Sequence, residues 1–307
     1  MKNEVRSPIT NSLNTIKIKD ISINQLVNDY KIILPEIEVE KYFGGKSTIE
    51  LYECKDTNYR FYYPFNLDGD DEFYVHLGKL SWYYLRWKWE HQFALECINK
   101  GSKVLEVGAG KGDFIRELIE KLNCKCTGLE LNPDIKDICD KYGVDLRNET
   151  IQNHALNNLN VYDTICTFQV LEHVSDVSGF IKGMVDCLKP KGTLIIAVPN
   201  NDTFIKDNPL PSKALNMPPH HVGLWTETSL SKIASCFGLE LVAIDFEPLQ
   251  QSNMDTYIAA DIQKRFGKFA RRLMWKLNIH KLIRLLLRKK INAIKGHSII
   301  AKYRKIA

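Results

Sequence analysis

Residues 104–112 read Val104-Leu105-Glu106-Val107-Gly108-Ala109-Gly110-Lys111-Gly112, and this stretch decides the fold. Its apolar run predicts a short strand that is buried on both faces. The alternating glycines predict a tight bend in which the backbone can approach a ligand closely. Apolar residues at helical spacing then predict a helix over residues 112–122. A ligand above the bend would therefore meet backbone N–H groups and the positive end of a helix dipole.

The spacing of the bend indicates which kind of ligand it binds. Glu106 stands inside an otherwise apolar strand, where an unpaired carboxylate is costly. The pattern Glu-x-Gly-x-Gly-x-Gly differs from the dinucleotide pattern Gly-x-Gly-x-x-Gly, and the Gly-Lys-Ser/Thr of a phosphate loop is missing. An acid beside a glycine bend suits a ligand that carries positive charge and no phosphate. S-adenosylmethionine, with its ammonium and sulfonium groups, is such a ligand.

The composition is that of a globular protein with one large domain or two small ones. The chain has 307 residues, of which 44% are hydrophobic and 26% are charged. It contains no apolar run near the roughly 20 residues of a membrane span, and its start lacks the apolar run of a signal peptide. The eight cysteines form no Cys-x-x-Cys pair. We therefore expect buried thiols in a reducing, cytoplasmic compartment and no metal site.

The charge is distributed unevenly along the chain. Residues 262–307 contain fifteen Lys and Arg and no acid, which leaves 27 basic and 37 acidic residues before them. Within this region residues 264–295 form two basic amphipathic segments, one around Phe266–Leu277 and one around Ile279–Leu286. One interpretation is a helical hairpin with a solvated charged face. The second is peripheral contact with an anionic membrane, at the inner membrane surface. Nucleic acid is the least favoured partner, because the body is acidic.

From residue 103 onward predicted strands and helices alternate, which indicates βαβ units and a parallel sheet. The predicted strands are 104–107, 126–130, 144–147, 164–168, 193–198 and 240–246. The predicted helices are 112–122, 133–142, 150–157, 176–188 and 228–237, with a turn at 189–192. A last β-rich run at 297–304 is expected to lie antiparallel in the sheet and to pair with 240–246. Residues 250–296 are then a helical insertion between neighbouring strands.

The first 99 residues have a different character. Residues 1–22 are expected to be irregular, and a short helix is expected at 24–34. Two strands at 49–54 and 59–64 form a predicted hairpin. Residues 73–99 form a predicted helical region that is rich in aromatic residues. Its rings are expected to pack a small core; the alternative is that some of them, with Lys88, close over a ligand beside the glycine bend.

Ligands of open parallel sheets bind beyond the carboxyl ends of the strands, so each strand end is a candidate site. The second strand ends at Glu130, about twenty residues after the glycines, where a carboxylate can accept both hydroxyls of a ribose. The fourth strand ends in Phe168-Gln169-Val170-Leu171-Glu172-His173-Val174. These ends meet at one edge of the sheet and predict a single site there.

The ordered motifs VLEVGAGKGDF, GLELN, YDTICTFQVLEHV, LKPKGTLIIAVPN and PPHHVGLW resemble the class I S-adenosylmethionine-dependent methyltransferases. The resemblance covers about residues 100–247. It is strongest to the branch with quinone-biosynthesis O-methyltransferases and enzymes of bacterial surface-polysaccharide biosynthesis. It implies an α/β fold with a Rossmann-like seven-stranded sheet whose last strand is antiparallel. The implied organisation is an N-terminal cap at 1–99 that selects the acceptor, and a methyltransferase domain at 100–307 with its insertion at 250–296.

The resemblance also implies residue roles. Glu106, Gly108, Ala109, Gly110 and Gly112 would shape the pocket for the methionine end of the donor. Glu130 would bind the ribose and Ile151 would contact the adenine. Phe168 and Gln169 would line the point where the methyl group meets its acceptor.

Four residues are candidates for the acceptor chemistry. His220 and His221 follow the fifth predicted strand, and Glu172 and His173 follow the fourth. An alcohol acceptor must lose a proton, and histidine is the usual base near neutral pH. The alternative is that each histidine bonds the loop backbone. The predicted function is O-methylation of a sugar, glycan or small molecule; the alternatives are N- or C-methylation, or a non-catalytic donor-binding partner subunit.

Overall fold

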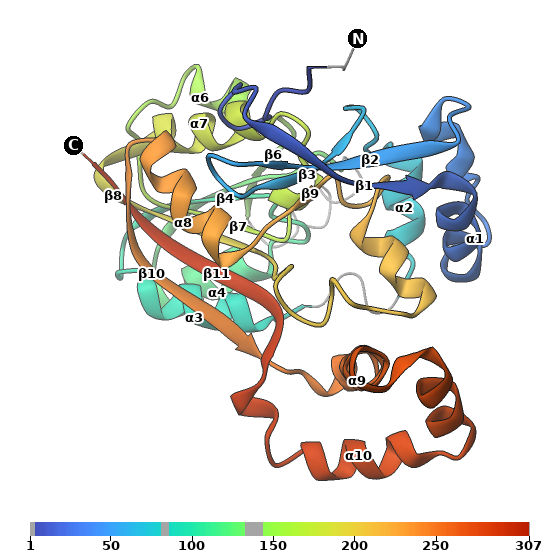
Figure 1. Ribbon diagram of the computed structural model, residues 1–307. Helices are drawn as coiled ribbons and strands as arrows, with labels where there is room; N and C mark the ends of the chain where they lie inside the picture. Colours follow the sequence, from blue (N-terminus) through green and yellow to red (C-terminus); the bar gives the residue numbers. More distant parts are fainter. Residues whose placement is uncertain (1–3, 81–85, 133–143, 307) are drawn as a thin grey trace.

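The computed structural model describes residues 4–80, 86–132 and 144–306. A seven-stranded sheet dominates it, with the strand order β10-β11-β8-β7-β4-β5-β6 (Figure 1). The strands are β4 (Lys103–Val107), β5 (Lys125–Leu129), β6 (Asp145–Arg147), β7 (Tyr162–Phe168), β8 (Leu188–Pro199), β10 (Leu239–Pro248) and β11 (Lys295–Lys305). β11 is antiparallel to both β8 and β10, as predicted, and the other neighbours are parallel. The predicted α/β fold class is confirmed.

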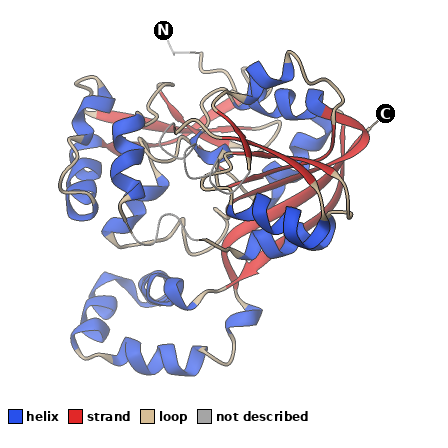
Figure 2. Ribbon diagram, turned by 180° about the vertical axis from the view of Figure 1, so that it is seen from behind, coloured by secondary structure: helices blue, strands red, loops and turns tan. Residues whose placement is uncertain are grey.

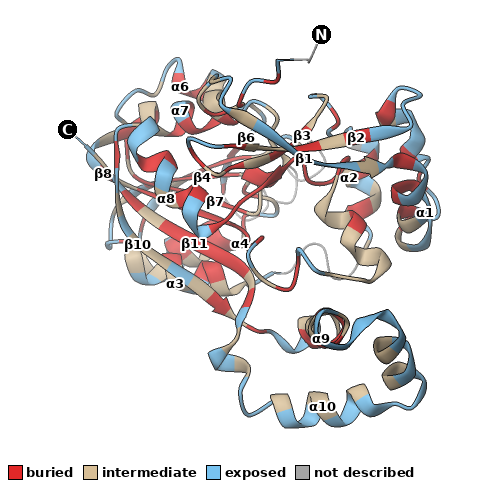
Figure 3. Ribbon diagram, in the orientation of Figure 1, coloured by how far each residue is buried: buried red, intermediate tan, exposed pale blue. Residues whose placement is uncertain are grey.

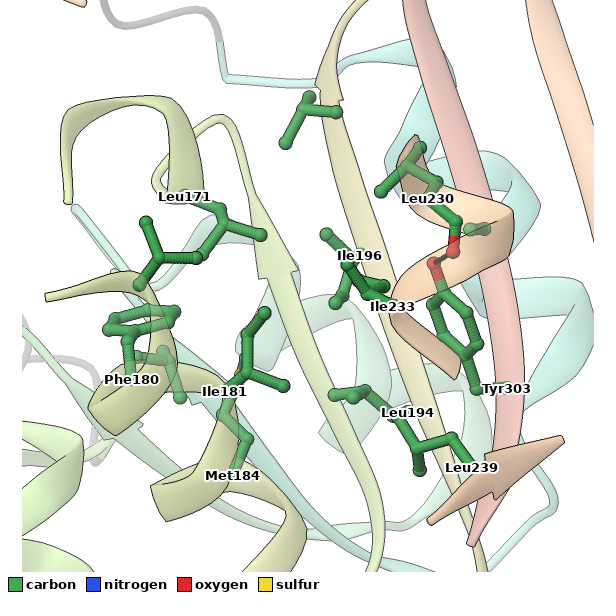
Figure 4. Packing of buried hydrophobic residues seen from close by; sticks show 14 of the residues in the cluster. Leu171, Phe180, Ile181, Met184, Leu194, Ile196, Leu230, Ile233, Leu239 and Tyr303 are labelled. Atoms are coloured by element: carbon green, nitrogen blue, oxygen red, sulfur yellow. Dashed lines mark hydrogen bonds between the residues drawn. The ribbon is translucent and has the colours of Figure 1, made fainter. Parts of the chain in front are cut away.

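Helices cover both faces of this sheet (Figure 2). On one face lie α3 (Trp89–Cys97) and α4 (Asp113–Leu122); on the other lie α6 (Ile151–Ala155), α7 (Val177–Cys187) and α8 (Glu227–Cys236). Because side chains alternate along a strand, β8 sends Leu194 and Ile196 to the second face and Ile195 to the first. Figure 4 shows Leu194 and Ile196 between α7 and α8, with Tyr303 of β11 beside them.

The start of β8 differs from the prediction. The turn predicted at 189–192 is wrong, because these residues belong to β8. They form an irregularity in it: the register against β7 shifts between Tyr162 and Thr164, and Lys191 has a φ of 63°. The helix predicted at 133–142 lies outside the described residues.

The N-terminal residues form a second, four-stranded sheet with the order β1-β2-β3-β9. Its strands are β1 (Thr15–Ser22), β2 (Thr48–Cys54), β3 (Arg60–Tyr63) and β9 (Gly223–Leu224). The predicted hairpin is confirmed as β2 and β3. The irregular segment predicted at 1–22 is wrong over residues 15–22, since β1 pairs antiparallel with β2, whereas residues 4–14 contain no helix or strand. Ile16 and Ile18 are 44% and 43% exposed, so backbone pairing rather than a buried face orders β1, and local sequence does not reveal it.

Helices α1 (Ile23–Ile33) and α2 (Asp71–Gly78) and the 3-10 helix η1 (Val39–Phe43) pack against this second sheet. The helix predicted at 24–34 is confirmed, with Leu26, Val27 and Tyr30 buried. The helical region predicted at 73–99 contains two separate helices, α2 and α3, and the described residues 86–88 before α3 are not helical. The physical reason is that their apolar faces serve different cores: Phe73 packs in the second sheet's core, and Ala94 packs on the main sheet.

The predicted helical insertion between the last two strands is confirmed. It contains η5 (Gln251–Asn253), α9 (Met254–Lys276), α10 (Ile279–Leu287) and η6 (Ile291–Ala293), and it projects from the main sheet (Figure 1). Gly267, with a φ of 83°, interrupts α9. Within the described residues, none of the helices combines the length and the apolar character needed to cross a bilayer.

Candidate active site

A cavity of about 1710 Å³ lies at the carboxyl edge of the parallel strands, larger than a typical site for one small ligand. One wall comes from strand ends and includes Glu106, Gly108, Ala109, Gly110, Glu130, Ile151, Phe168 and Gln169. Further lining residues come from the N-terminal part of the chain: Tyr74, Trp87, Lys88 and Glu90. Glu172, His173, His220 and His221 also line it. Gly112 does not line it but precedes α4, with a φ of 69°.

The glycine bend has the conformation that its sequence requires. Gly108 and Gly110 have φ values of 78° and 50°, a region that favours glycine. The N–H groups of Gly108 and Ala109 both donate to the carbonyl of Leu129, at 2.9 Å each. A Cβ on Gly108 would lie only 2.3 Å from Cγ2 of Val170. The bend is therefore tied to β5 and closely packed against the segment after β7.

Two carboxyl groups flank the bend. Glu106 is 3% exposed, and burial raises the pKa of its carboxyl well above the ordinary value. Its Oε2 has no hydrogen-bond partner among the described residues. Glu130 accepts hydrogen bonds from the N–H of Gly110, at 2.8 Å, and from the N–H of Asn132, at 2.9 Å. Oε2 of Glu106 thus lacks a hydrogen-bond partner among the described residues, whereas the carboxylate of Glu130 fixes the shape of the bend.

Gln169 stands where β7 ends, between the two halves of the cavity. Its φ of 57° is uncommon for a residue with a side chain. Its backbone N–H donates to the carbonyl of Ala197, at 2.8 Å. Its side-chain amide donates to Oε1 of Glu90 and to Oγ of Ser298, at 3.3 Å each. Gln169 thereby joins the end of β7 to α3 and to the start of β11 in the cavity wall.

The three candidate histidines form one cluster. His173 belongs to the 3-10 helix η3 (Leu171–His173), and His220 and His221 follow the 3-10 helix η4 (Pro211–Asn216). The rings of His220 and His221 stack with centroids 4.3 Å apart. The ring of His173 lies 4.7 Å from that of His220 and 4.9 Å from that of His221. The fold therefore brings the two predicted groups of candidates together.

Each histidine of the cluster has a defined partner at Nδ1. Nδ1 of His173 donates to the carbonyl of His220 at 2.5 Å, and Nδ1 of His220 donates to the carbonyl of Leu215 at 2.7 Å. Nδ1 of His221 lies 3.0 Å from Oδ1 of Asn216. Nδ1 of His173 and Nδ1 of His220 thus bond the loop backbone, as in the alternative role, whereas Nδ1 of His221 bonds a side chain.

Burial dominates the titration of this cluster. It lowers the pKa of His173 to about 4 and the pKa values of His220 and His221 well below the ordinary value, so the rings are neutral at physiological pH. Burial raises the pKa of Glu172 to about 8. Oε2 of Glu172 is buried and has no hydrogen-bond partner among the described residues. The cluster therefore carries little charge at physiological pH.

Three further residues of the cavity wall escaped the sequence analysis: Glu90, Glu247 and Ser298. Glu247 accepts hydrogen bonds from the N–H groups of His297 and Ser298, at 3.1 Å each. It stands at the carboxyl end of β10, so the strand-end reasoning applied to Glu130 would have found it. Glu90 and Ser298 carry no comparable local signal, because α3 and the start of β11 reach the cavity only through the fold.

Comparison with known proteins identifies the family. A family model described as a methyltransferase domain matches residues 81–244, more than half of the chain. The chain belongs to this family. Its fold is that of the class I S-adenosylmethionine-dependent methyltransferases, and S-adenosylmethionine is the cofactor of this methyltransferase.

Two of the individual relatives that these comparisons found share less than 30% sequence identity with this chain. The methyltransferase is 28% identical over 106 residues to the ubiquinone biosynthesis O-methyltransferase of Xanthomonas oryzae pv. oryzae (strain PXO99A), covering 33% of this chain and 44% of that protein. The chain thus spans less than half the length of the curated relatives it matches. A structure of an S-adenosylmethionine-dependent methyltransferase from Archaeoglobus fulgidus superposes with a TM-score of 0.52 and 16% identity, covering 77% of this chain and 100% of that one. At this identity the likeness shows the fold alone.

The cavity fits the cofactor. The buried, partnerless Oε2 of Glu106 suits an ammonium group, and the bend at Gly108 and Gly110 leaves no side chain between the backbone and a ligand. Among the described residues that line the cavity, none belongs to a Gly-Lys-Ser/Thr phosphate loop. The residues that line it on the donor side therefore agree with a cationic, phosphate-free ligand.

Proposed function

We propose that this enzyme transfers a methyl group from S-adenosylmethionine to an oxygen of a sugar, glycan or other small molecule, as in polysaccharide biosynthesis. One observation carries the proposal: the glycine bend with its two acids and the acid–histidine cluster line the same cavity. The cavity is large enough for a donor and an acceptor together.

The donor half of the cavity supplies binding and orientation. We assign the buried carboxyl of Glu106 to the donor's ammonium group, since an unpaired buried carboxylate is stabilised by a cation. Glu130 is assigned to the ribose hydroxyls, and Ile151, which is 1% exposed, to the adenine. When bound, S-adenosylmethionine supplies an electrophilic methyl group.

The acceptor half supplies alignment and proton removal. In-line displacement gains most from holding the two reactants in register, a role that we assign to Phe168 and Gln169. Because Nδ1 of His220 donates to a carbonyl, its proton is on Nδ1, and Nε2 is then the basic atom of the ring. We assign proton removal to the cluster of Glu172, His173, His220 and His221.

A second candidate function is N-methylation of an amine, such as an amino sugar. The acceptor side of the cavity includes the carboxyl groups of Glu90, Glu172 and Glu247, which suit a cationic acceptor. We further propose that residues 1–99 act as the acceptor-side cap of a methyltransferase domain at 100–307. Tyr74, Lys88 and Glu90 support this division, since they line the same cavity as the glycine bend.

The decisive experiment incubates the enzyme with a methyl-labelled donor and a panel of sugars, amino sugars and phenols, and locates the new methyl group by mass spectrometry. An O-methyl product supports the proposal, and an N- or C-methyl product replaces it with the alternative. Donor binding without turnover on every acceptor indicates the non-catalytic partner subunit.

Replacement of the cluster histidines tests the assignment of proton removal. His220→Ala and His221→Ala, made singly, are each expected to lower kcat by at least about tenfold and to leave donor affinity unchanged. His280→Ala, on α10 and outside the cavity lining, is the control. If either alanine variant fails to fold, glutamine replaces alanine. Full activity of both variants would contradict the assignment.

We also propose that the hairpin of α9 and α10 contacts an anionic membrane surface. Phe269, Leu285 and Leu286 are 79%, 58% and 66% exposed, and basic residues surround them. Figure 3 shows α10 and the end of α9 as exposed or intermediate along their whole length. Exposed apolar residues among cations are typical of helices that lie on anionic bilayers.

A further inference from the structure

We propose that His173, His220 and His221 form a binding site for a divalent transition-metal ion such as Zn²⁺. Each histidine offers one ring nitrogen, and these nitrogens all lie within 4.8 Å of one another. Tetrahedral ligands at about 2.05 Å from zinc lie roughly 3.3 Å apart, so small ring rotations would close the site. Among the described residues no other group of histidine, cysteine or acidic side chains has this arrangement.

The hydrogen bonds of the cluster set the tautomer that metal binding requires. The carbonyls of His220 and Leu215 only accept hydrogen bonds, so Nδ1 of His173 and of His220 carries the proton. A neutral ring with its proton on Nδ1 presents Nε2 as the ligand atom. Metal-binding histidines almost always donate their other ring N–H to an oxygen in this way.

His221 reaches the same tautomer through a chain of side chains. The amide of Asn201 donates to the carbonyl of Pro199 at 3.2 Å, which orients this side chain. Oδ1 of Asn201 then accepts from the amide of Asn216 at 2.7 Å. Oδ1 of Asn216 is therefore directed at Nδ1 of His221, 3.0 Å away, and accepts its proton. Three consecutive hydrogen bonds thus orient one imidazole.

A buried acid beside the histidines supplies the second observation. Glu172 is 1% exposed, and its Oε2 has no hydrogen-bond partner among the described residues. Its Oε1 lies 3.8 Å from Nε2 of His173. A buried carboxyl without a partner is costly, and a neighbouring cation removes that cost. Imidazole ligands favour zinc, copper, iron or nickel over magnesium or calcium.

The site deepens the proposed function, on which its chemical role rests. All four residues line the cavity, so the ion's remaining coordination position would face the acceptor. With the ion bound, the Nε2 atoms act as its ligands and not as bases. The ion lowers the pKa of a coordinated oxygen ligand, and Glu172 is the group of the cluster that can then accept the proton. Three protein ligands and one open position are the usual arrangement of a catalytic zinc site.

The test is direct metal binding by the full-length, untagged protein after treatment with a chelator. Calorimetric titration with Zn²⁺ is expected to show one ion per chain. His173→Ala and His221→Ala are each expected to weaken binding at least about 100-fold. Asn216→Ala, which removes only the orienting amide, is expected to weaken it about 10- to 100-fold. His280→Ala controls for adventitious binding to a surface histidine.

Co²⁺ provides a second measurement that does not depend on activity. Co²⁺ bound by the cluster is expected to give a visible absorption band that is lost in His221→Ala and in His221→Gln, with folding checked by circular dichroism. Failure of the wild-type protein to bind Zn²⁺ overturns the inference, as does unchanged affinity in both histidine variants. Zinc binding without methyl transfer would instead refute the proposed function and leave the metal site standing.

Discussion

At the scale of single residues, the cavity is built from conformations and charges that a stable fold normally avoids. Gly108 has a positive φ and no room for a Cβ, and Gln169 has a positive φ despite its side chain. Glu106 and Glu172 bury carboxyl oxygens without a hydrogen-bond partner among the described residues. Such features cluster at sites where a ligand compensates for them.

Gly108→Ala is expected to lose donor binding and about 1–3 kcal/mol of stability, because the new Cβ strains the backbone and meets Val170. Chemical denaturation and donor calorimetry measure the two effects. The double variant Gly108→Ala/Val170→Ala is expected to recover the share of the lost stability that comes from the clash between the new Cβ and Val170. Gly238→Ala is the matched control, since its φ is 63° with open space around the Cβ position. Unimpaired donor binding by Gly108→Ala would refute the idea that the glycine bend lets the backbone approach the donor closely.

Glu247 makes stability depend on pH. Burial, and then the charge of Glu90 on α3, raise the pKa of Glu247 to about 7, while N–H groups of β11 oppose the rise. Because the folded pKa lies above the ordinary value, folding favours the protonated form. This stabilisation is present below pH 4.5 and is lost as pH rises through 7.

Glu247→Gln is therefore expected to reduce the loss of stability between pH 5 and pH 8 by up to about 3 kcal/mol. Urea unfolding at the two pH values measures the difference. Glu90→Gln, which removes only the neighbouring charge, is expected to have a smaller effect of the same sign. An identical pH dependence in the wild-type protein and Glu247→Gln would show that Glu247 does not titrate in this range.

At the scale of elements, the hairpin of α9 and α10 differs from the other helices. The first half of α9 buries Met254, Ile258 and Ile262, whereas α10 has no buried residue. The break at Gly267 separates these two parts. Residues next to the start of α9, including Ser252 and Thr256, line the cavity. A surface bound by α10 would therefore lie near the acceptor side of the site.

Vesicle binding tests the hairpin. The protein is expected to sediment with vesicles rich in phosphatidylglycerol, less with neutral ones, and less at high salt, because charge attraction is screened. Phe269→Asp/Leu286→Asp is expected to weaken binding at least about tenfold, since two apolar side chains no longer enter the bilayer. Leu156→Asp/Leu159→Asp, at residues 77% and 61% exposed, is the matched control. Equal sedimentation of both variants would exclude the hairpin as the contact.

At the scale of the whole molecule, the cavity depends on two sheets that are joined through one short strand. β9 follows β8 in the chain but pairs with β3 of the N-terminal sheet. The same connection contains His220 and His221 and bonds Tyr30 of α1, whose hydroxyl donates to the carbonyl of Met217 at 2.8 Å. The position of the histidines therefore depends on the docking of the N-terminal residues.

The demethylated product of the donor, if it binds only the folded protein, raises the free energy of unfolding of the whole molecule. S-adenosylhomocysteine at 100 times its Kd is expected to add about 2.7 kcal/mol to the free energy of unfolding. Glu106→Gln is expected to remove most of this gain, whereas Glu227→Gln, at an exposed site, is expected to retain it. Thermal unfolding with and without the ligand is the measurement. An equal gain in Glu106→Gln would contradict the assignment of Glu106 to the donor.

Most of the main sheet and the donor wall could be predicted because their signals are local. Strand, bend and helix follow one another within residues 103–122, and Glu130 ends the next strand. The strand β1 and the break between α2 and α3 could not be predicted. β1 forms because it pairs with β2, and α2 and α3 are separate because they pack on two different cores. Hydrophobic periodicity within a short window predicts neither.

The sequence by itself determined the fold class, the antiparallel last strand and the glycine bend with its two acids, since contiguous motifs encode them. Only the tertiary structure decided the half of the cavity that we assign to the acceptor. There Glu90, Gln169 and Ser298 meet through side-chain hydrogen bonds, and His173 joins the pair at 220–221 across 47 positions. The physical reason is that such contacts arise from packing between distant elements, whereas backbone bends and strand ends arise from neighbouring residues.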